Sequence, residues 1–128
     1  MPFVRISLMR GKSAEYRTAI SEAVHQAMVE TIDVPQDDRF QVFHEREPDG
    51  LIYDPTYLGI ERSNDLLILQ ITMRRGRTVE QKKAFYRRLV SLLAENPGVR
   101  SQDVFVNLIE NSEADWSFGN GEAQRAEV

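Results

Sequence analysis

The second residue of the chain is a proline, and its chemistry depends on whether Met1 stays attached. A proline that begins a chain carries a free secondary amine, which no other residue type can supply. A proline that follows another residue has no N–H, so it is tolerated at the first position of a β-strand. The start MPFVRISLM therefore fits either a catalytic amine or an ordinary strand. We expect Met1 to be removed, because the residue after it is small.

Arginines and acids elsewhere in the chain could serve such an amine. Arg74, Arg75 and Arg77 lie in the segment MRRGR (73–77), and a planar guanidinium can bind both oxygens of a substrate carboxylate. The alternative for each arginine is a solvated turn. Nearby cations lower the pKa of an amine, and a carboxylate such as Asp37 or Asp38 raises it. The sequence is thus compatible with a neutral general base and with a cationic general acid.

Composition narrows the classes of function. The 128 residues carry a net charge of −4, which disfavours nucleic acid as a partner. The absence of cysteine excludes disulfides, thiol catalysis and cysteine-ligated metals. Because His25 and His44 are not spaced as zinc ligands, we predict neither a metal nor a cofactor. No apolar run is long enough to span a bilayer and no signal peptide is visible, so the predicted location is cytoplasmic without a membrane partner.

The chain contains an internal repeat with an offset of about 65 residues. MRGKSAEYR (9–17) is similar to MRRGRTVEQK (73–82), and the offset also aligns turn and strand residues further along. The aligned pairs are Gly11 with Gly76, Ser13 with Thr78, Val34 with Val99, Asp38 with Asp103, Phe40 with Phe105 and Glu45 with Glu110. We therefore predict two copies of one structural unit.

Each copy has the pattern of a β-α-β unit. Alternation at Val4, Ile6 and Leu8 indicates a strand, Ser13 is a suitable N-cap, and apolar residues recur at helical spacing until Val34-Pro35. A second strand is expected over 40–45. In the second copy we expect a strand over 66–71, a capping box of Thr78 and Gln81, a helix over 79–94 and a strand over 103–109.

These elements predict one α+β domain over residues 1–128. It comprises a first β-α-β unit (1–45), a connection (46–64) with a short strand near Leu58 to Ile60, a second β-α-β unit (65–110) and a tail (111–128). Two such units can share a four-stranded mixed sheet with both helices on one face. The other face then needs a cover, so we expect oligomerisation.

Four stretches together resemble the tautomerase superfamily, whose members use an amino-terminal proline, and most closely its malonate semialdehyde decarboxylase group. They are Met1-Pro2, VPQDDRFQVFHE (34–45), MRRGR (73–77) and ADWSFG (114–119), and the similarity covers nearly the whole chain. The resemblance implies a tautomerase-like fold that assembles as a homotrimer. It also implies a cofactor-independent enzyme for a small carboxylate substrate.

The resemblance assigns roles to individual residues. Pro2 corresponds to the catalytic proline, Asp38 to the acid that handles water, and Arg74 to the first of two arginines that hold the substrate carboxylate. In the family the two arginines are separated by one residue. In this chain the position of the second one, two after Arg74, is Gly76, so either Arg75 or Arg77 takes the second role. Trp116 and Phe118 correspond to an aromatic wall of the pocket.

Two reactions fit these residues. One is keto–enol tautomerisation, and the other is decarboxylation of malonate semialdehyde with a hydratase side reaction. Asp38 and the aromatic tail favour the second, and the shifted arginine pattern weakens it. A hypothesis of another class is a non-catalytic trimer that binds a ligand or serves as a scaffold, which retention of Met1 would favour.

Overall fold

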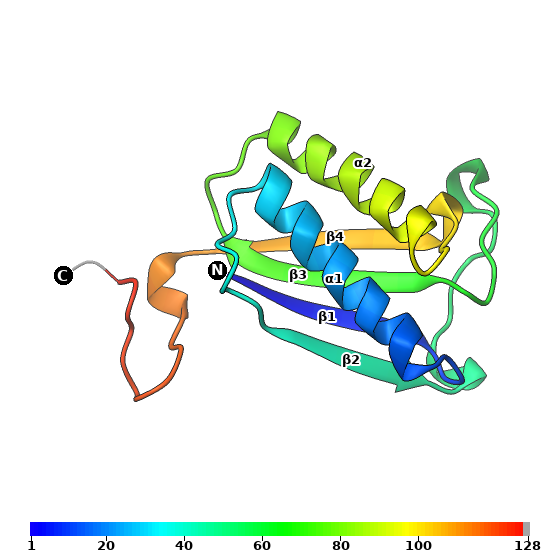
Figure 1. The fold of residues 1–128 in the computed structure, drawn as a ribbon, viewed down its shortest axis with the longest axis horizontal. Helices are drawn as coiled ribbons and strands as arrows, with labels where there is room; N and C mark the ends of the chain where they lie inside the picture. Colours follow the sequence, from blue (N-terminus) through cyan, green and yellow to red (C-terminus); the bar gives the residue numbers. More distant parts are fainter. Residues whose placement is uncertain (127–128) are drawn as a thin grey trace.

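A four-stranded mixed sheet carries two helices on one of its faces (Figure 1). The computed structural model describes residues 1–126. The strands and helices are β1 (Pro2–Met9), α1 (Ala14–Thr31), β2 (Gln41–Arg46), β3 (Leu67–Arg74), α2 (Val79–Glu95) and β4 (Val104–Asn111). The strand order is β2-β1-β3-β4, with β1 antiparallel to β3 and the two outer pairs parallel. The predicted fold class is confirmed.

The two β-α-β units repeat in space as the sequence predicted. The bounds of β1 and β3 differ by the same 65-residue offset, and α1 and α2 begin at equivalent residues. Gly11 and Gly76 end the first strand of each unit with φ angles of 108° and 128°, which favour glycine. Ser13 and Thr78 then cap the helices, and the capping box of Thr78 with Gln81 is present.

The hydrophobic core lies between the helices and one face of the sheet. Alternate residues of β1 and β3 are buried there, from Val4 to Leu8 and from Leu67 to Met73, against Phe85 and Leu89 of α2 and the apolar face of α1. The near-continuous apolar run of β3 is typical of a strand that is covered on both faces. In the single chain Ile68 is only half-buried, because the helices cover one face.

The face opposite the helices presents apolar side chains. Val42, Phe105 and Ile109 project from it and are 41%, 48% and 40% exposed. Apolar side chains on an exposed sheet face are typical of a surface that packs against another protein. No helix among residues 1–126 is both long and apolar enough to cross a membrane.

The connection differs from the prediction, which was wrong in one element. Residues Tyr57–Gly59 form a short 3-10 helix, and the expected strand near Leu58 to Ile60 does not form. Leu58 has a φ of 62°, a left-handed conformation that a strand residue does not adopt. The tail is aperiodic as expected, with a 3-10 turn at Glu113–Asp115, although Asn111 still belongs to β4.

Candidate active site

The register of the sheet brings the predicted site residues to one end of it. Pro2 pairs with Met73 across the antiparallel β1–β3 ladder, so Met1 lies beside Arg74. The loop that precedes β2 reaches the same end, because β2 runs parallel to β1 with Val4 opposite Gln41. β4 also ends here, and its continuation, the tail, extends beyond this end of the sheet (Figure 1).

The amino terminus is paired with Asp38. The Met1 amine lies 2.9 Å from Asp38 Oδ2, and both side chains are largely buried, with 5% and 16% exposed. Asp38 Oδ1 is buried without a hydrogen-bond partner within the described part of the chain. Pro2 is buried and is the first residue of β1. Because Asp38 pairs with the Met1 amine, its carboxylate lies at the start of this strand.

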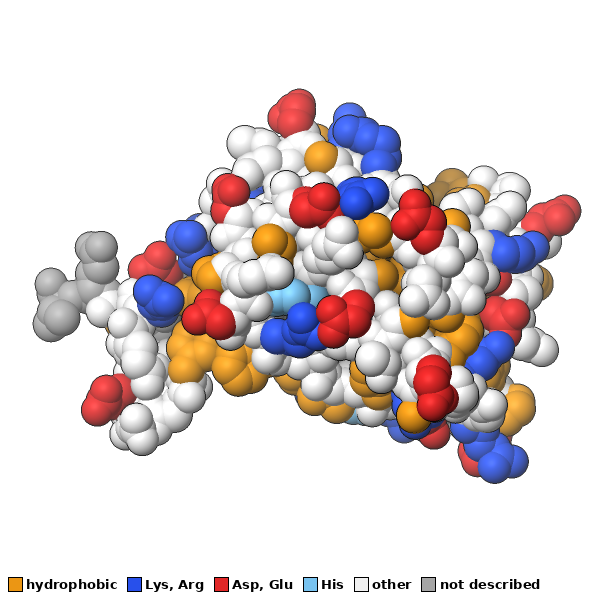
Figure 2. Space-filling view, in the orientation of Figure 1, with side chains coloured by type: hydrophobic (Ala, Val, Ile, Leu, Met, Phe, Trp, Pro, Cys, Tyr) orange, Lys and Arg blue, Asp and Glu red, His pale blue; other side chains and the backbone are white. Residues whose placement is uncertain are grey.

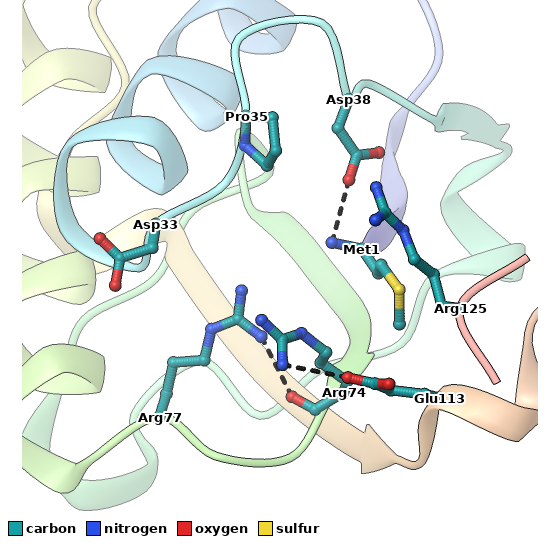
Figure 3. A pocket seen from close by; sticks show the side chains of 8 residues that line it. All are labelled: Met1, Asp33, Pro35, Asp38, Arg74, Arg77, Glu113 and Arg125. Atoms are coloured by element: carbon teal, nitrogen blue, oxygen red, sulfur yellow. Dashed lines mark hydrogen bonds and ion pairs between the residues drawn. The ribbon is translucent and has the colours of Figure 1, made fainter. Parts of the chain in front are cut away.

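A cavity of about 220 Å³ surrounds this ion pair (Figure 3). It is lined by Met1, Asp33, Pro35, Asp38, Arg74, Arg77, Glu113 and Arg125. Most of these residues carry a charge, and they come from four segments of the chain. The cavity therefore suits a small polar molecule rather than a large apolar one.

Two of the three predicted arginines line the cavity. Arg74 Nη1 lies 3.3 Å from Glu113 Oε1, and Arg77 donates from Nε and Nη2 to the Ile32 carbonyl at the end of α1 and from Nη1 to the Arg74 carbonyl. Burial, together with the neighbouring charge of Arg74, lowers the pKa of Arg77. Arg75 is exposed and does not line this cavity within residues 1–126.

The two predicted aromatic residues lie beside the cavity in an aromatic cluster with Phe40. Trp116 and Phe118 stack with ring centroids 5.7 Å apart, and Phe118 lies 5.8 Å from the Phe40 ring. The Trp116 indole N–H donates to Asn111 Oδ1 at 2.8 Å, which ties the tail to the end of β4. Phe40 and Phe118 line an adjoining cavity of about 350 Å³ that shares Met1, Pro35, Asp38 and Arg125 with the first.

A hydrophobic patch appears where the tail meets the body of the molecule (Figure 2). The aromatic cluster occupies this junction, since Phe40 precedes β2 and Trp116 follows β4. Phe40 and Phe118 form the apolar side of the adjoining cavity, whereas, within residues 1–126, Trp116 lines neither of these two cavities. Such a combination orients a small ligand, because the charged groups bind one end and the apolar wall excludes water from the other.

Three charged residues of the cavity were missed by the sequence analysis. Asp33 follows α1, and Glu113 and Arg125 lie in the tail, where no periodicity marks a side chain as inward-facing. The only signal was charge in an aperiodic segment, which is the usual property of a solvated loop. Among residues 1–126, no group of three or more His, Asp or Glu side chains could hold a metal ion.

Comparison with known proteins identifies the family. A family model described as tautomerase enzyme matches residues 38–119, and a second model with the same description matches residues 2–60. The chain belongs to the tautomerase family. It is 46% identical over 127 residues to "Probable tautomerase YusQ" of Bacillus subtilis (strain 168), which covers 99% of this chain and 100% of that protein.

Several solved structures have the same fold. Malonate semialdehyde decarboxylase, solved in wild-type, mutant and inactivated forms, is 36% identical, with a TM-score of 0.90 over 95% of this chain and 94% of that one. The FG41 malonate semialdehyde decarboxylase inhibited by 3-bromopropiolate is 39% identical, with a TM-score of 0.89 over 95% of this chain and 92% of that one. A fused 4-OT symmetric trimer shares the fold at 22% identity and a TM-score of 0.77, covering 96% and 97%.

Proposed function

We propose that this tautomerase is an amino-terminal-proline enzyme that acts on a small oxo-carboxylate. Removal of Met1 would leave the secondary amine of Pro2 at the start of β1. The observation that carries the proposal is the 2.9 Å ion pair between the Met1 amine, one residue before Pro2, and Asp38, at a cavity that Arg74 and Arg77 also line. This arrangement places an amine, a carboxylate and two arginines at one cavity.

Each residue then has a role. Pro2 gives and takes the proton, Arg74 and Arg77 hold the substrate carboxylate, and Asp38 orients the amine or a water molecule. Arg77 already donates to two backbone carbonyls, so it also keeps the turn after β3 in place. Trp116 and Phe118 form the apolar wall. Arg75, which does not line the cavity formed by the described residues, is the weaker candidate for the second carboxylate-binding arginine.

Two reactions use these parts in different ways. In tautomerisation, the neutral Pro2 amine removes a proton from the carbon next to a carbonyl, the electron pair forms an enolate, and Pro2 returns the proton to the oxygen to give the enol. In decarboxylation, a cationic Pro2 polarises the carbonyl oxygen, the bond to the carboxylate breaks as CO2 leaves, and its electron pair forms an enolate whose oxygen takes the proton from Pro2 to give the enol. The likeness to malonate semialdehyde decarboxylase supports the second reaction, and the probable-tautomerase relative supports the first.

Reaction with 3-bromopropiolate tests the proposal. Intact mass establishes whether Met1 is absent, and the labelling rate is then followed against pH with the modified residue mapped by mass spectrometry. Labelling at Pro2 that begins near neutral pH indicates a neutral amine and a tautomerase. Labelling that is present at neutral pH and fades only at alkaline pH indicates a cationic proline and decarboxylase or hydratase chemistry.

Two variants complete this experiment. Pro2→Ala leaves a primary amine and should slow labelling, and Asp38→Asn should abolish decarboxylation and hydration while sparing tautomerisation. Equal loss of all three activities in Asp38→Asn would contradict separate roles for Pro2 and Asp38. An unlabelled Pro2 in a protein that retains Met1 would instead favour a non-catalytic ligand-binding or scaffold protein of the same fold.

We also propose that the chain forms a homotrimer through the face opposite the helices. The exposed Val42, Phe105 and Ile109 on that face support self-association, because water leaves apolar surface when copies pack together. Sedimentation at several protein concentrations tests this. A charged substitution, Phe105→Glu, should dissociate the assembly, whereas Tyr86→Glu on the exposed side of α2 should leave it intact.

A further inference from the structure

Arg125 reaches the cavity from the tail, on the side away from Arg74 and Arg77. Figure 3 shows its side chain extending from the tail toward Met1 and Asp38, while Arg74 approaches from the end of β3 and Arg77 from the turn that follows. Arg125 also lines the adjoining cavity, together with Phe40 and Phe118. It therefore lies at the boundary between the charged cavity and the aromatic one.

Two of the four cations at the cavity are held in ion pairs. The amine pairs with Asp38 and Arg74 pairs with Glu113. Arg77 donates to backbone carbonyls and is close enough to Asp33 for that carboxylate to act on its charge. Within residues 1–126, Arg125 makes no ion pair or hydrogen bond through its side chain, which leaves a cation directed at the space occupied by Met1.

Met1 occupies the space between these opposed cations. It lines both cavities and its side chain is 5% exposed. A substrate that takes its place, with one carboxylate on Arg74 and Arg77, would place its reacting carbonyl beside Pro2 and Asp38. Its far end would then meet Arg125. A guanidinium at that position favours a second carboxylate, because a charge-assisted hydrogen bond is stronger than a neutral one.

We propose that Arg125 is a specificity-determining residue that selects an oxo-dicarboxylate over the corresponding oxo-monocarboxylate. This inference rests on the proposed function, because it assigns the first carboxylate to Arg74 and Arg77. Arg125 binds the far carboxylate and takes no part in proton transfer at Pro2.

A matched pair of ligands tests the inference. 2-Oxoadipate and 2-oxohexanoate both have six carbons and a 2-oxo acid group, and they differ by the second carboxylate. Calorimetric titration of the protein lacking Met1 should give binding of 2-oxoadipate about tenfold tighter than that of 2-oxohexanoate, the effect of one hydrogen bond to a charged group. Added salt should reduce this preference, because Arg125 is exposed.

Three variants separate the possible outcomes. Arg125→Gln should remove the preference by weakening 2-oxoadipate alone, and Arg74→Gln should weaken both ligands. Arg87→Gln, on the exposed side of α2, is the control and should change neither. A preference that persists in Arg125→Gln, equal weakening of both ligands in that variant, or equal binding of both by the unsubstituted protein would overturn the inference. If Pro2 reacts with 3-bromopropiolate in that same protein, the proposed function still stands; if Pro2 is unreactive and neither ligand binds, both fail.

Discussion

Replacing Asp103 by Asn should destabilise the protein more than the same change at Asp38, although the two residues are equivalent in the internal repeat. Asp103 is fully buried at the start of β4 and accepts hydrogen bonds from the backbone N–H and the hydroxyl of Ser63, both at 2.7 Å. Arg100 Nε donates to it at 3.2 Å. Asp38 instead has the amino terminus as its single ion-pair partner among the described residues.

The size of the effect follows from these partners. In Asp103→Asn an amide NH2 replaces one carboxylate oxygen, so one charge-assisted bond is lost and the donor of Arg100 faces another donor. The expected loss is about 2 kcal/mol in the free energy of unfolding. For Asp38→Asn the amide oxygen can still accept from the Met1 amine, and Asp38 Oδ1 has no partner to lose among residues 1–126, so the expected loss is below about 1 kcal/mol.

The effect at Asp103 should depend on pH. Burial raises the pKa of Asp103, but the hydrogen bonds from Ser63 and Arg100 outweigh burial and hold this pKa below its usual value. A carboxyl whose pKa is lower in the native state stabilises the fold above its unfolded pKa of about 4. This contribution is lost as the pH falls through the native pKa, so the wild type and Asp103→Asn should converge in stability below about pH 4.

Urea unfolding followed by Trp116 fluorescence measures the free energy of unfolding of the wild type and both variants. The protomer concentration is kept fixed, because self-association shifts the apparent stability. At pH 7 the midpoint of Asp103→Asn should fall by about 1 M, and that of Asp38→Asn should change much less. The reasoning is refuted if both variants lose equal stability at pH 7, or if the deficit of Asp103→Asn persists undiminished at pH 3.

Three further predictions concern the helix start, the turn and the aromatic wall. Thr78→Ala removes the hydroxyl that accepts from the Gln81 N–H, so the free energy of unfolding should fall by about 1 kcal/mol; thermal unfolding measures this, and an unchanged midpoint would contradict the capping role. Arg77→Lys cannot reproduce the paired donors to the Ile32 carbonyl, so the free energy of unfolding should also fall by about 1 kcal/mol. Urea unfolding measures this, and the exposed Arg87→Lys should show no loss. Phe118→Ala removes the ring stacked on Trp116, which should shift the tryptophan emission to longer wavelength and raise KM about fivefold with kcat retained; an unaltered emission would place Phe118 outside the wall.

The sequence predicted most of the fold because the signals for it are local. Alternation in β1, helical spacing in α1 and the capping box of Thr78 and Gln81 are each properties of a short segment. The expected strand near Leu58 failed for a non-local reason. Strand formation requires a partner, and the short apolar run in the connection has none in the four-stranded sheet.

The sequence by itself determined the residue types of the site, a proline at position 2, an acid at Asp38 and arginines at the end of β3 and in the turn after it, together with the repeat that holds them. Only the tertiary structure decided which of these meet. The antiparallel register of Pro2 with Met73 brings Arg74 beside the amino terminus, and the turn at Gly76 directs Arg77 to the same cavity while Arg75 stays exposed. The tail adds Arg125 from more than a hundred residues away in the sequence. Register and chain return are long-range properties, so no local pattern could specify them.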